Sequence, residues 1–215
     1  VPRLRIICPT RSRLQEQAFR DGSDVVVWLN DDTNLYAHAI PELLTALVET
    51  DFLSIIVGAI SWPNSGEVAY SGGVRRHPLL RPFRYQLVSP TGGLQRLDVM
   101  NGNCVAITRE VASKVGALDS IYQHGMGDID YALRANRLGV DVFLTPNFIG
   151  TCSRNPVAGT LHDHNTGWVD RLRFAVSRKG LPPKSWWALC RRHGGPLFIF
   201  QFLWSYLRVV ISARP

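Results

Sequence analysis

Two acidic residues stand directly behind an apolar run in the stretch "VVVWLNDDT", where Asp31 and Asp32 follow residues 25–29. In an open α/β sheet, ligands bind just beyond the carboxyl ends of the strands. Adjacent carboxylates there repel each other, and a divalent cation carrying a diphosphate would neutralise them. The alternative is structural, because one Asp can cap the following turn while the other is solvated. The residues alone leave the two interpretations equally open.

A second acidic site follows much later in the chain, in "GMGDIDYALR". Asp128 is placed to begin a helix, and Asp130 and Arg134 have the i, i+4 spacing of an ion pair. As an alternative, Asp128 is a plain N-cap. Two separate acidic positions, each before a helix, are what a transferase requires if a metal holds the leaving group and another carboxylate acts as base.

Two further polar groups are candidate ligands. Asn101 and Asn103 lie in an Asn-Gly-Asn stretch, where they either hydrogen-bond a sugar or simply form a turn. His162 and His164 alternate in "LHDHN", so on an extended segment both side chains point the same way, as metal ligands do. A polar surface loop is the commoner explanation of such a segment.

Strand-like and helix-like segments alternate along the chain. Residues 24–29 show no polar alternation, which is typical of a central strand buried on both faces. Strand, helix and strand in succession predict a βαβ crossover, so we expect an α/β fold with a mainly parallel sheet flanked by helices. A βαβ unit needs roughly 30 residues, so at most one precedes Asn30. The expected strands are 4–8, 24–29, 52–60, 99–108 and 140–146, and the expected helices are 13–22, 40–50, 109–115 and 128–139, with loops and a hairpin in 61–98.

The composition is that of a folded globular protein, with 46% hydrophobic and 19% charged residues. The net charge of +7 is unevenly distributed, because residues 171–215 hold nine Lys or Arg residues and no acid. We therefore expect a domain in residues 1–170 and a basic helical tail in 171–215. The four cysteines have no paired spacing, which favours free thiols in a cytosolic protein over disulfides or a zinc site. No signal peptide is expected in the basic opening segment.

The tail contains a hydrophobic segment, residues 197–211, that is shorter than the ~20 residues needed to span a bilayer. Its polar residues Gln201, Ser205, Arg208 and Ser212 form one helical stripe. Packing against the domain is one interpretation. A broad apolar face beside an acid-free basic segment favours another, namely peripheral contact with an anionic membrane surface.

Three segments, taken together and in this order, resemble family 2 glycosyltransferases of the GT-A fold, with rhamnosyltransferase-like members the most similar. The segments are "VVVWLNDDT", "VMNGNCVAITREVASKVGALDSIYQHGMGDIDYALRANRLGVDVFLTP" and "GTCSRNP", and the resemblance covers residues 20–195. It implies transfer of a hexosyl or rhamnosyl group from a nucleotide diphosphate sugar, with inversion at the anomeric carbon. It also implies a Mn²⁺ or Mg²⁺ cofactor.

The resemblance assigns roles to individual residues. The acidic motif of the family corresponds to Asn30, Asp31 and Asp32, all of which would bind the donor, with Asp32 also binding the cation. The family's base corresponds to Asp128, which would deprotonate the acceptor hydroxyl, and Gly127 stands where the family has Glu. The donor-binding segment before this motif is shorter than in the family.

We therefore expect a metal-dependent glycosyltransferase that acts in cell-envelope polysaccharide biosynthesis on a glycan or lipid-linked acceptor. It would lie in the cytoplasm, peripherally on the inner face of the membrane. Asn101, Asn103 and Asp130 are expected to contact the acceptor, and His162 and His164 to add to the metal site. The main alternative is a catalytically silent, membrane-attached binding or scaffold module derived from such an enzyme. No nucleic-acid partner is expected, because aromatic and basic residues do not interleave on any expected strand.

Overall fold

The computed structural model describes residues 2–8, 12–77, 81–122, 125–153 and 167–211, which form two compact units. Unit 1 comprises Val1–Arg75, Tyr85–Asp119 and Asp128–Arg154, and unit 2 comprises Arg76–Arg84, Ser120–Gly127 and Asn155–Pro215. The boundary expected after residue 170 falls inside unit 2. This unit also includes two short segments from the earlier part of the chain, Arg76–Arg84 and Ser120–Gly127.

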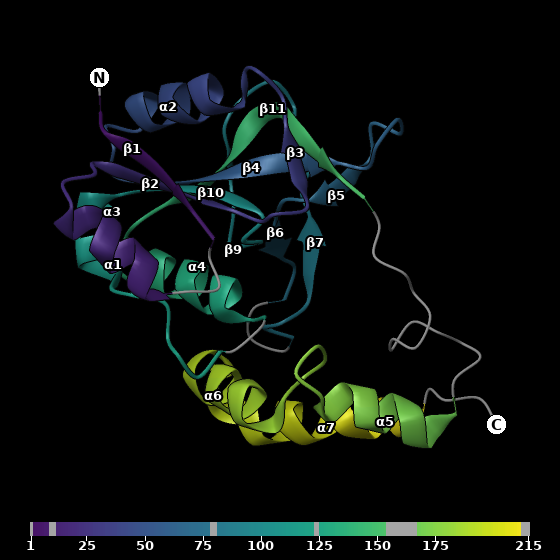
Figure 1. Cartoon of the computed structure of the whole chain (residues 1–215). Coiled ribbons are helices and arrows are strands. Elements are labelled where there is room, and N and C mark those ends of the chain that lie inside the picture. Colours follow the sequence, from purple (N-terminus) through teal and green to yellow (C-terminus); the bar gives the residue numbers. More distant parts are fainter. Residues whose placement is uncertain (1, 9–11, 78–80, 123–124, 154–166, 212–215) are drawn as a thin grey trace. The chain divides into compact units, whose positions relative to one another are not determined.

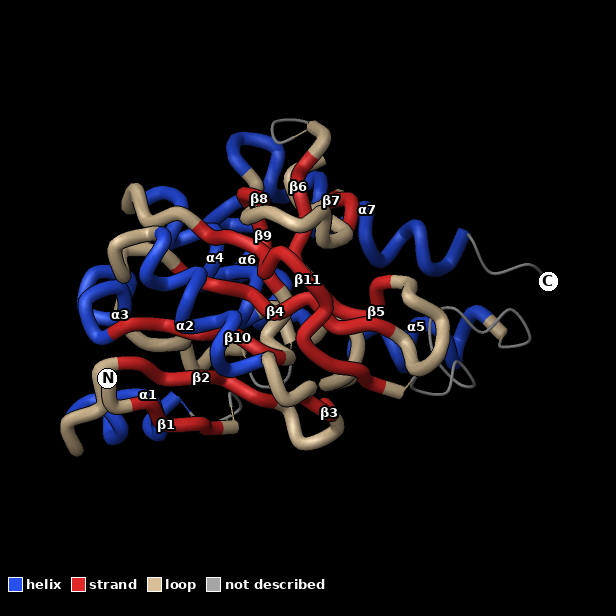
Figure 2. Tube along the Cα trace, turned by 90° about the horizontal axis from the view of Figure 1, so that it is seen from above, coloured by secondary structure: helices blue, strands red, loops and turns tan. Residues whose placement is uncertain are grey.

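Unit 1 is built on a sheet of eight strands within the described residues, with the order β1-β2-β10-β4-β11-β3 and with β5 beside β4 and β8 beside β11 (Figure 2). Strands β1, β2, β4 and β11 share one direction, and β10 runs antiparallel between β2 and β4. The expected mainly parallel α/β sheet is therefore confirmed. The bounds are β1 (Leu4–Ile7), β2 (Val25–Leu29), β3 (Thr33–Leu35), β4 (Ile55–Ser61), β5 (Val68–Tyr70), β8 (Gln95–Arg96), β10 (Cys104–Thr108) and β11 (Val142–Cys152).

Helices cover both faces of this sheet (Figure 1). Helices α1 (Ser12–Arg20), α3 (Arg109–Val115) and α4 (Gly127–Arg137) pack on one face, and α2 (Ala39–Glu49) packs on the other. The central strand β2 serves both cores, because successive side chains of a strand point to opposite faces. Val26 and Trp28 belong to the core under α1, α3 and α4, whereas Val25 and Val27 belong to the core under α2.

The structure departs from the expected strands at three places. Residues 99–108 form two strands, β9 (Val99–Met100) and β10, because the side-chain oxygen of Asn101 accepts from the backbone N–H of Asn103 and makes a turn. Strand β11 extends to Cys152, since its register shifts after Leu144 and so accommodates Pro146. Strand β3 was not expected, because three residues are too few to show a period.

A second sheet, also in unit 1, joins three short strands in the order β7 (Tyr85–Leu87), β6 (Gly72–Arg75) and β9 among the described residues. The antiparallel pair of β6 and β7 provides the hairpin expected within residues 61–98.

The regular elements that the structure describes in unit 2 lie in its last segment and are helices. Its elements are α5 (Trp168–Val176), α6 (Pro183–His193), a 3-10 turn η1 (Gly195–Leu197) and α7 (Phe198–Ile211). Edge-to-face aromatic contacts from Trp187 to Phe198 and Phe202 hold α6 against α7. In the described part of the chain, no helix has both the length and the hydropathy needed to cross a membrane.

The pairing of β3 with β11 depends on Gly150, and this gives a test of the fold. A Cβ atom at this position would lie 2.6 Å from the backbone oxygen of Asn34 in β3. We expect Gly150→Ala to lower the free energy of unfolding by about 1–3 kcal/mol, because the backbone of β3 must move away. Gly93→Ala is the matched control, since no atom lies within 4 Å of its Cβ position. Equal urea midpoints for the two variants would contradict this packing.

Candidate functional site

The acidic residues lie in a tight loop between β2 and β3, at the carboxyl end of the central strand. We call residues 30–33 the acidic loop, of which Thr33 is also the first residue of β3. Its middle residues Asp31 and Asp32 are both exposed, and the backbone N–H of Thr33 donates to the carbonyl of Asn30 over 3.3 Å. The local sequence explains the arrangement, because β2 ends where the apolar run ends and the polar residues then turn the chain. The expected position of the acidic pair at a strand end is therefore confirmed.

Asn103 contacts both ends of the acidic loop. Its carbonyl accepts from the backbone N–H of Asn30 over 2.9 Å, and its side-chain oxygen accepts from Nδ2 of Asn30 over 3.0 Å. Its own Nδ2 donates to Oγ1 of Thr33 over 3.4 Å. The residue is only 5% exposed. This geometry favours a positioning role over the predicted contact of Asn103 with an acceptor sugar.

Asn101 and Gly102 connect this arrangement to Asp128 at the start of α4. Asn101 is half-buried, and its backbone N–H donates to the carbonyl of Ser71 over 3.0 Å. The N–H of Gly102 donates to Oδ2 of Asp128 over 2.9 Å. Residues 101–103 therefore contact the acidic loop on one side and Asp128 on the other. The two acidic positions, far apart in the sequence, lie at the same end of the sheet.

Asp128 is half-buried and lies in the first turn of α4, where Oδ1 accepts from the N–H of the next residue, Ile129, over 2.9 Å. Burial raises the pKa of Asp128 above its ordinary value, and the backbone N–H groups of Ile129 and Gly102 oppose that shift. A carboxylate with a raised pKa is a stronger base at neutral pH. The expected helix is present and begins one residue earlier than expected, at Gly127. The two backbone bonds leave this carboxylate with acceptor capacity for a further proton donor.

The residue two positions before Asp128 has an unusual backbone. Met126 adopts a φ of 68°, in the left-handed region that residues other than glycine rarely occupy. Such conformations cluster at functional sites, where the surrounding structure holds them.

Asp130 points away from this site into the core. Its side chain is fully buried, and Oδ2 accepts from Nε of Arg134 over 2.8 Å, which confirms the predicted ion pair. The guanidinium of Arg134 also donates to the carbonyls of Val115 and Ala117, so the pair fastens α4 to the end of α3. These contacts favour a structural role for Asp130 over the predicted contact with an acceptor.

Two residues that sequence reasoning did not select also lie near the site. Burial, followed by the negative charge of Asp32, raises the pKa of the Cys152 thiol, so the end of β11 lies close to Asp32. Burial, followed by the charge of Asp128, raises the pKa of Tyr85, whose ring lies over Gly73. Cys152 ends the part of β11 that the sequence did not reveal, and Tyr85 lies in a stretch without clear periodicity, so neither had a local signal.

The candidate metal ligands are described only in part, because His162 and His164 lie outside the described residues. Within those described, no cluster of three or more His, Cys, Asp or Glu side chains suits a metal ion. Two exposed neighbouring carboxylates nevertheless fit Mn²⁺ or Mg²⁺, because such sites use one or two carboxylates and complete the coordination with water and substrate phosphates.

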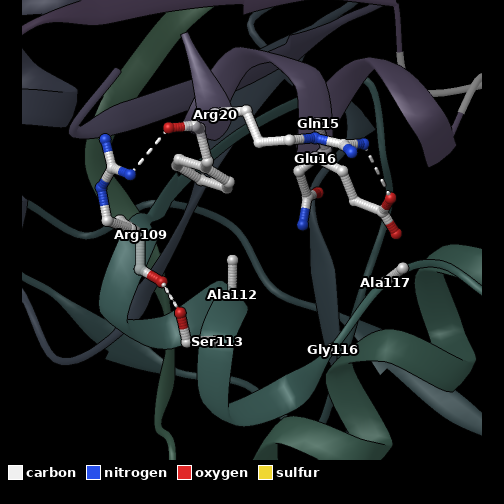
Figure 3. Close-up of a pocket in the computed structure, with 9 residues that line it drawn as sticks. Gln15, Glu16, Arg20, Arg109, Ala112, Ser113, Gly116 and Ala117 are labelled. Atoms are coloured by element: carbon white, nitrogen blue, oxygen red, sulfur yellow. Dashed lines mark hydrogen bonds and ion pairs between the residues drawn. The ribbon is translucent and has the colours of Figure 1, made fainter. Parts of the chain in front are cut away.

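A pocket between α1 and α3, with a volume of about 500 Å³, contains none of the predicted site residues (Figure 3). Its polar side chains already serve the fold. Arg109 donates to the carbonyls of Phe19 and Ser23 over 2.7 and 2.5 Å, and Gln15 accepts from Nε1 of Trp28 over 2.9 Å. We therefore take the end of the sheet at the acidic loop, and not this pocket, as the candidate functional site.

Comparison with known proteins identifies the fold. No protein-family model matches the sequence, and no curated protein matches it. Among solved structures, the crystal structure of GalNAc-T7 with UDP, GalNAc and Mn²⁺ superposes with a TM-score of 0.53 at 14% identity. The match covers 95% of this chain and 45% of GalNAc-T7, so the chain spans less than half of that protein. A197 from STIV gives a TM-score of 0.39 at 9% identity, covering 67% of this chain and 74% of that one, which is too distant to carry weight. The chain has a fold similar to that of GT-A glycosyltransferases.

The raised pKa of Asp128 makes the stability of the protein depend on pH. Between the ordinary carboxyl value of 3.8 and the raised pKa, the folded chain binds more protons than the unfolded chain. The free energy of unfolding contributed by Asp128 therefore falls as pH rises through this window. We expect the free energy of wild type minus that of Asp128→Asn, from urea unfolding, to decrease with pH and then level off.

Asp51→Asn is the control for this measurement, because it removes an exposed carboxylate. A wild-type minus Asp128→Asn difference that stays constant, or rises with pH, would contradict the buried environment of Asp128.

Proposed function

We propose that this chain transfers a sugar from a nucleotide diphosphate sugar to an acceptor hydroxyl with inversion. The observation that carries the proposal is the hydrogen-bonded connection from Asp128 through residues 101–103 to the acidic loop. It brings a half-buried carboxylate of raised pKa close to an exposed acidic pair at the end of the sheet where α/β proteins bind ligands. A metal-assisted transfer with a general base uses both kinds of carboxylate.

The acidic loop would hold the donor. Asp32 would contribute a carboxylate to Mn²⁺ or Mg²⁺, while Asp31 and Asn30 would contact the sugar nucleotide. When bound, the cation neutralises the charge that develops on the departing diphosphate. The exposure of both carboxylates supports this role, because a cation with its phosphates needs access from solvent. His162 and His164 remain candidates for further metal ligands.

Asp128 would act on the acceptor. Its carboxylate would take the proton of the acceptor hydroxyl as that oxygen forms a bond to the anomeric carbon. The bond between the anomeric carbon and the diphosphate oxygen would break on the opposite side, which gives inversion. Asn101 and Tyr85 would contact the acceptor near this carboxylate. Asn101 precedes the glycine bonded to Asp128, and the charge of Asp128 contributes to the raised pKa of Tyr85, which supports this proposal.

UDP with Mn²⁺ is the first probe to use, because GalNAc-T7, of similar fold, was crystallised with both. We expect Asp32→Ala to abolish metal-dependent binding of UDP in calorimetry while the fold persists.

We expect Asp128→Asn to bind UDP normally and to transfer sugar at least about a hundredfold more slowly, as loss of a general base does. Asp51→Asn, far from both groups in the sequence and exposed, is the control for each assay.

The outcomes separate the roles. Equal UDP affinity in wild type, in Asp32→Ala and in chelator would remove Asp32 from the site. Near-normal transfer by Asp128→Asn would leave Asp128 as a helix cap. A chain that binds acceptor glycans but neither UDP nor GDP nor dTDP would be the silent binding module.

We further propose that unit 2 contacts an anionic lipid surface, on the inner face of the membrane, through helix α7. The observation behind this proposal is that α7 turns its apolar side outward. Phe200, Leu203 and Ile211 are 61%, 59% and 65% exposed, whereas the polar residues Gln201 and Ser205 are half-buried. A helix in contact with water shows the reverse arrangement.

The basic residues of unit 2 are complementary in charge to an anionic lipid surface. Exposed Lys184 and Arg191 lie on α6, which packs against α7, and exposed Arg208 lies on α7 itself. Basic residues beside an apolar face bind anionic headgroups, while the apolar side chains enter the interface. A membrane-bound enzyme would act on a lipid-linked or growing envelope glycan, which is the acceptor class that we propose.

Vesicle sedimentation tests the contact. We expect Leu203→Gln combined with Leu207→Gln to weaken binding to vesicles of phosphatidylglycerol and phosphatidylcholine by about tenfold or more. The reason is that two exposed apolar side chains would no longer enter the lipid interface. Leu53→Gln is the control, since Leu53 is as exposed as Leu207, at 50%, but lies in unit 1. Binding that is equal for both variants, or equal with vesicles lacking phosphatidylglycerol, would contradict the proposal.

A further inference from the structure

We propose that the side chain of Asn103 is a clamp that fixes the acidic loop relative to Asp128. Asn103 is then a positioning residue that sets the distance between the donor and the base. The clamp consists of the Asn103 carboxamide with its partners Asn30 and Thr33. This inference rests on the proposed transfer reaction for its consequence, but the clamp itself is a structural statement that is testable without any substrate.

The clamp closes the acidic loop at both ends. Asn30 precedes the two exposed carboxylates and Thr33 follows them, and the Asn103 side chain bonds to both residues, over 3.0 and 3.4 Å. The bond from the N–H of Thr33 to the carbonyl of Asn30 completes a closed ring. Asp31 and Asp32 are the only residues of the loop outside this set of contacts with Asn103. The two carboxylates therefore lie between two residues whose side chains bond to the same carboxamide.

The residue type suits the task. A carboxamide offers one acceptor atom and one donor group, and here the acceptor meets the amide of Asn30 while the donor meets the hydroxyl of Thr33. A carboxylate at position 103 would place a third negative charge beside the acidic pair. An aliphatic side chain would leave the amide of half-buried Asn30 and the hydroxyl of buried Thr33 without these partners. The neutral amide, which both donates and accepts, avoids the additional negative charge and the loss of these hydrogen bonds.

The same stretch of backbone holds the base. The N–H of Gly102, next to Asn103, donates to Asp128, and the N–H of Asn101 donates to the carbonyl of Ser71. Residues 101–103 are thus anchored to β6 through its preceding residue, to α4 and to the acidic loop. A movement of the loop toward or away from the base requires that the contacts of Asn103 break first. Donor and acceptor would otherwise approach each other at a variable distance, which slows transfer.

A matched pair of variants at Thr33 tests the clamp. Thr33→Val keeps the shape and the strand preference of the side chain but removes the hydroxyl, whereas Thr33→Ser keeps the hydroxyl. By amide hydrogen exchange in the full chain without ligand, we expect the N–H groups of Asn30 and Thr33 to exchange about tenfold faster in Thr33→Val. The amides of α2 should be unchanged, and Thr33→Ser should resemble wild type.

A double-mutant cycle adds a second readout, the affinity for UDP with Mn²⁺. If Asn103 and Thr33 act as one clamp, Asn103→Ala and Thr33→Val each weaken binding, and the double variant binds no more weakly than Asn103→Ala alone. Additive losses would show that the two residues act independently and would overturn the clamp.

The two readouts distinguish the clamp from the proposed function. If wild type does not bind UDP with Mn²⁺ but Thr33→Val frees the acidic loop in hydrogen exchange, the clamp stands and the proposed donor is wrong. If wild type binds UDP and Asp32→Ala does not, while Thr33→Val exchanges and binds like wild type, the clamp is wrong and the function stands. Faster exchange throughout unit 1 in Thr33→Val would indicate general destabilisation and would also overturn the clamp.

Discussion

The backbone break at Asn101, Gly102 and Asn103 is the constraint on which the candidate site depends. Without it, residues 99–108 would continue as one strand, and their N–H groups would be used within the sheet. Because the Asn101 side chain turns the chain there, the N–H of Gly102 becomes available to Asp128 and the Asn103 side chain becomes available to the acidic loop. One local turn thus connects two acidic positions that the sequence separates widely.

The electrostatic environments of these positions differ in a way that suits separate roles. Asp31 and Asp32 are exposed, so solvent and a bound cation can offset their mutual repulsion. Asp128 is half-buried, and burial raises its pKa despite the helix start and the backbone donors that favour its charged form. In the proposed mechanism, the exposed pair Asp31 and Asp32 therefore has the metal-binding role and the shielded Asp128 has the role of the base.

Sequence reasoning located the elements with strong patterns. The apolar runs of β2 and β4 and the periodicity of α2 and α4 indicate buried strands and amphipathic helices, and the structure has them within a few residues. The end of β2 also located the acidic loop correctly. In contrast, the sequence did not reveal β3, which has three residues, or the extension of β11 through Pro146. Proline normally argues against a strand, and here a register shift accommodates it.

The roles of buried polar residues were the least predictable part of the site. Asn103 and Asp130 have types that suit sugar binding, but whether a polar side chain faces a ligand or the protein depends on its tertiary partners. Thr33 supplies the partner of Asn103, and the guanidinium of Arg134 supplies that of Asp130. The Asp130–Arg134 pair was visible from its helical spacing, whereas the Asn103–Thr33 contact joins distant segments that no local pattern connects.

The most direct test of the account is paramagnetic line broadening by Mn²⁺ with UDP, mapped on the backbone amide resonances of the full chain. Bound Mn²⁺ broadens nuclei near it regardless of which residues hold it. The account predicts that broadening is strongest at residues 31–33, extends to residues 101–103 and Ile129, and is weak at the far end of α2. Broadening centred on the basic residues of α6 and α7, or on the pocket between α1 and α3, would contradict a donor site at the acidic loop.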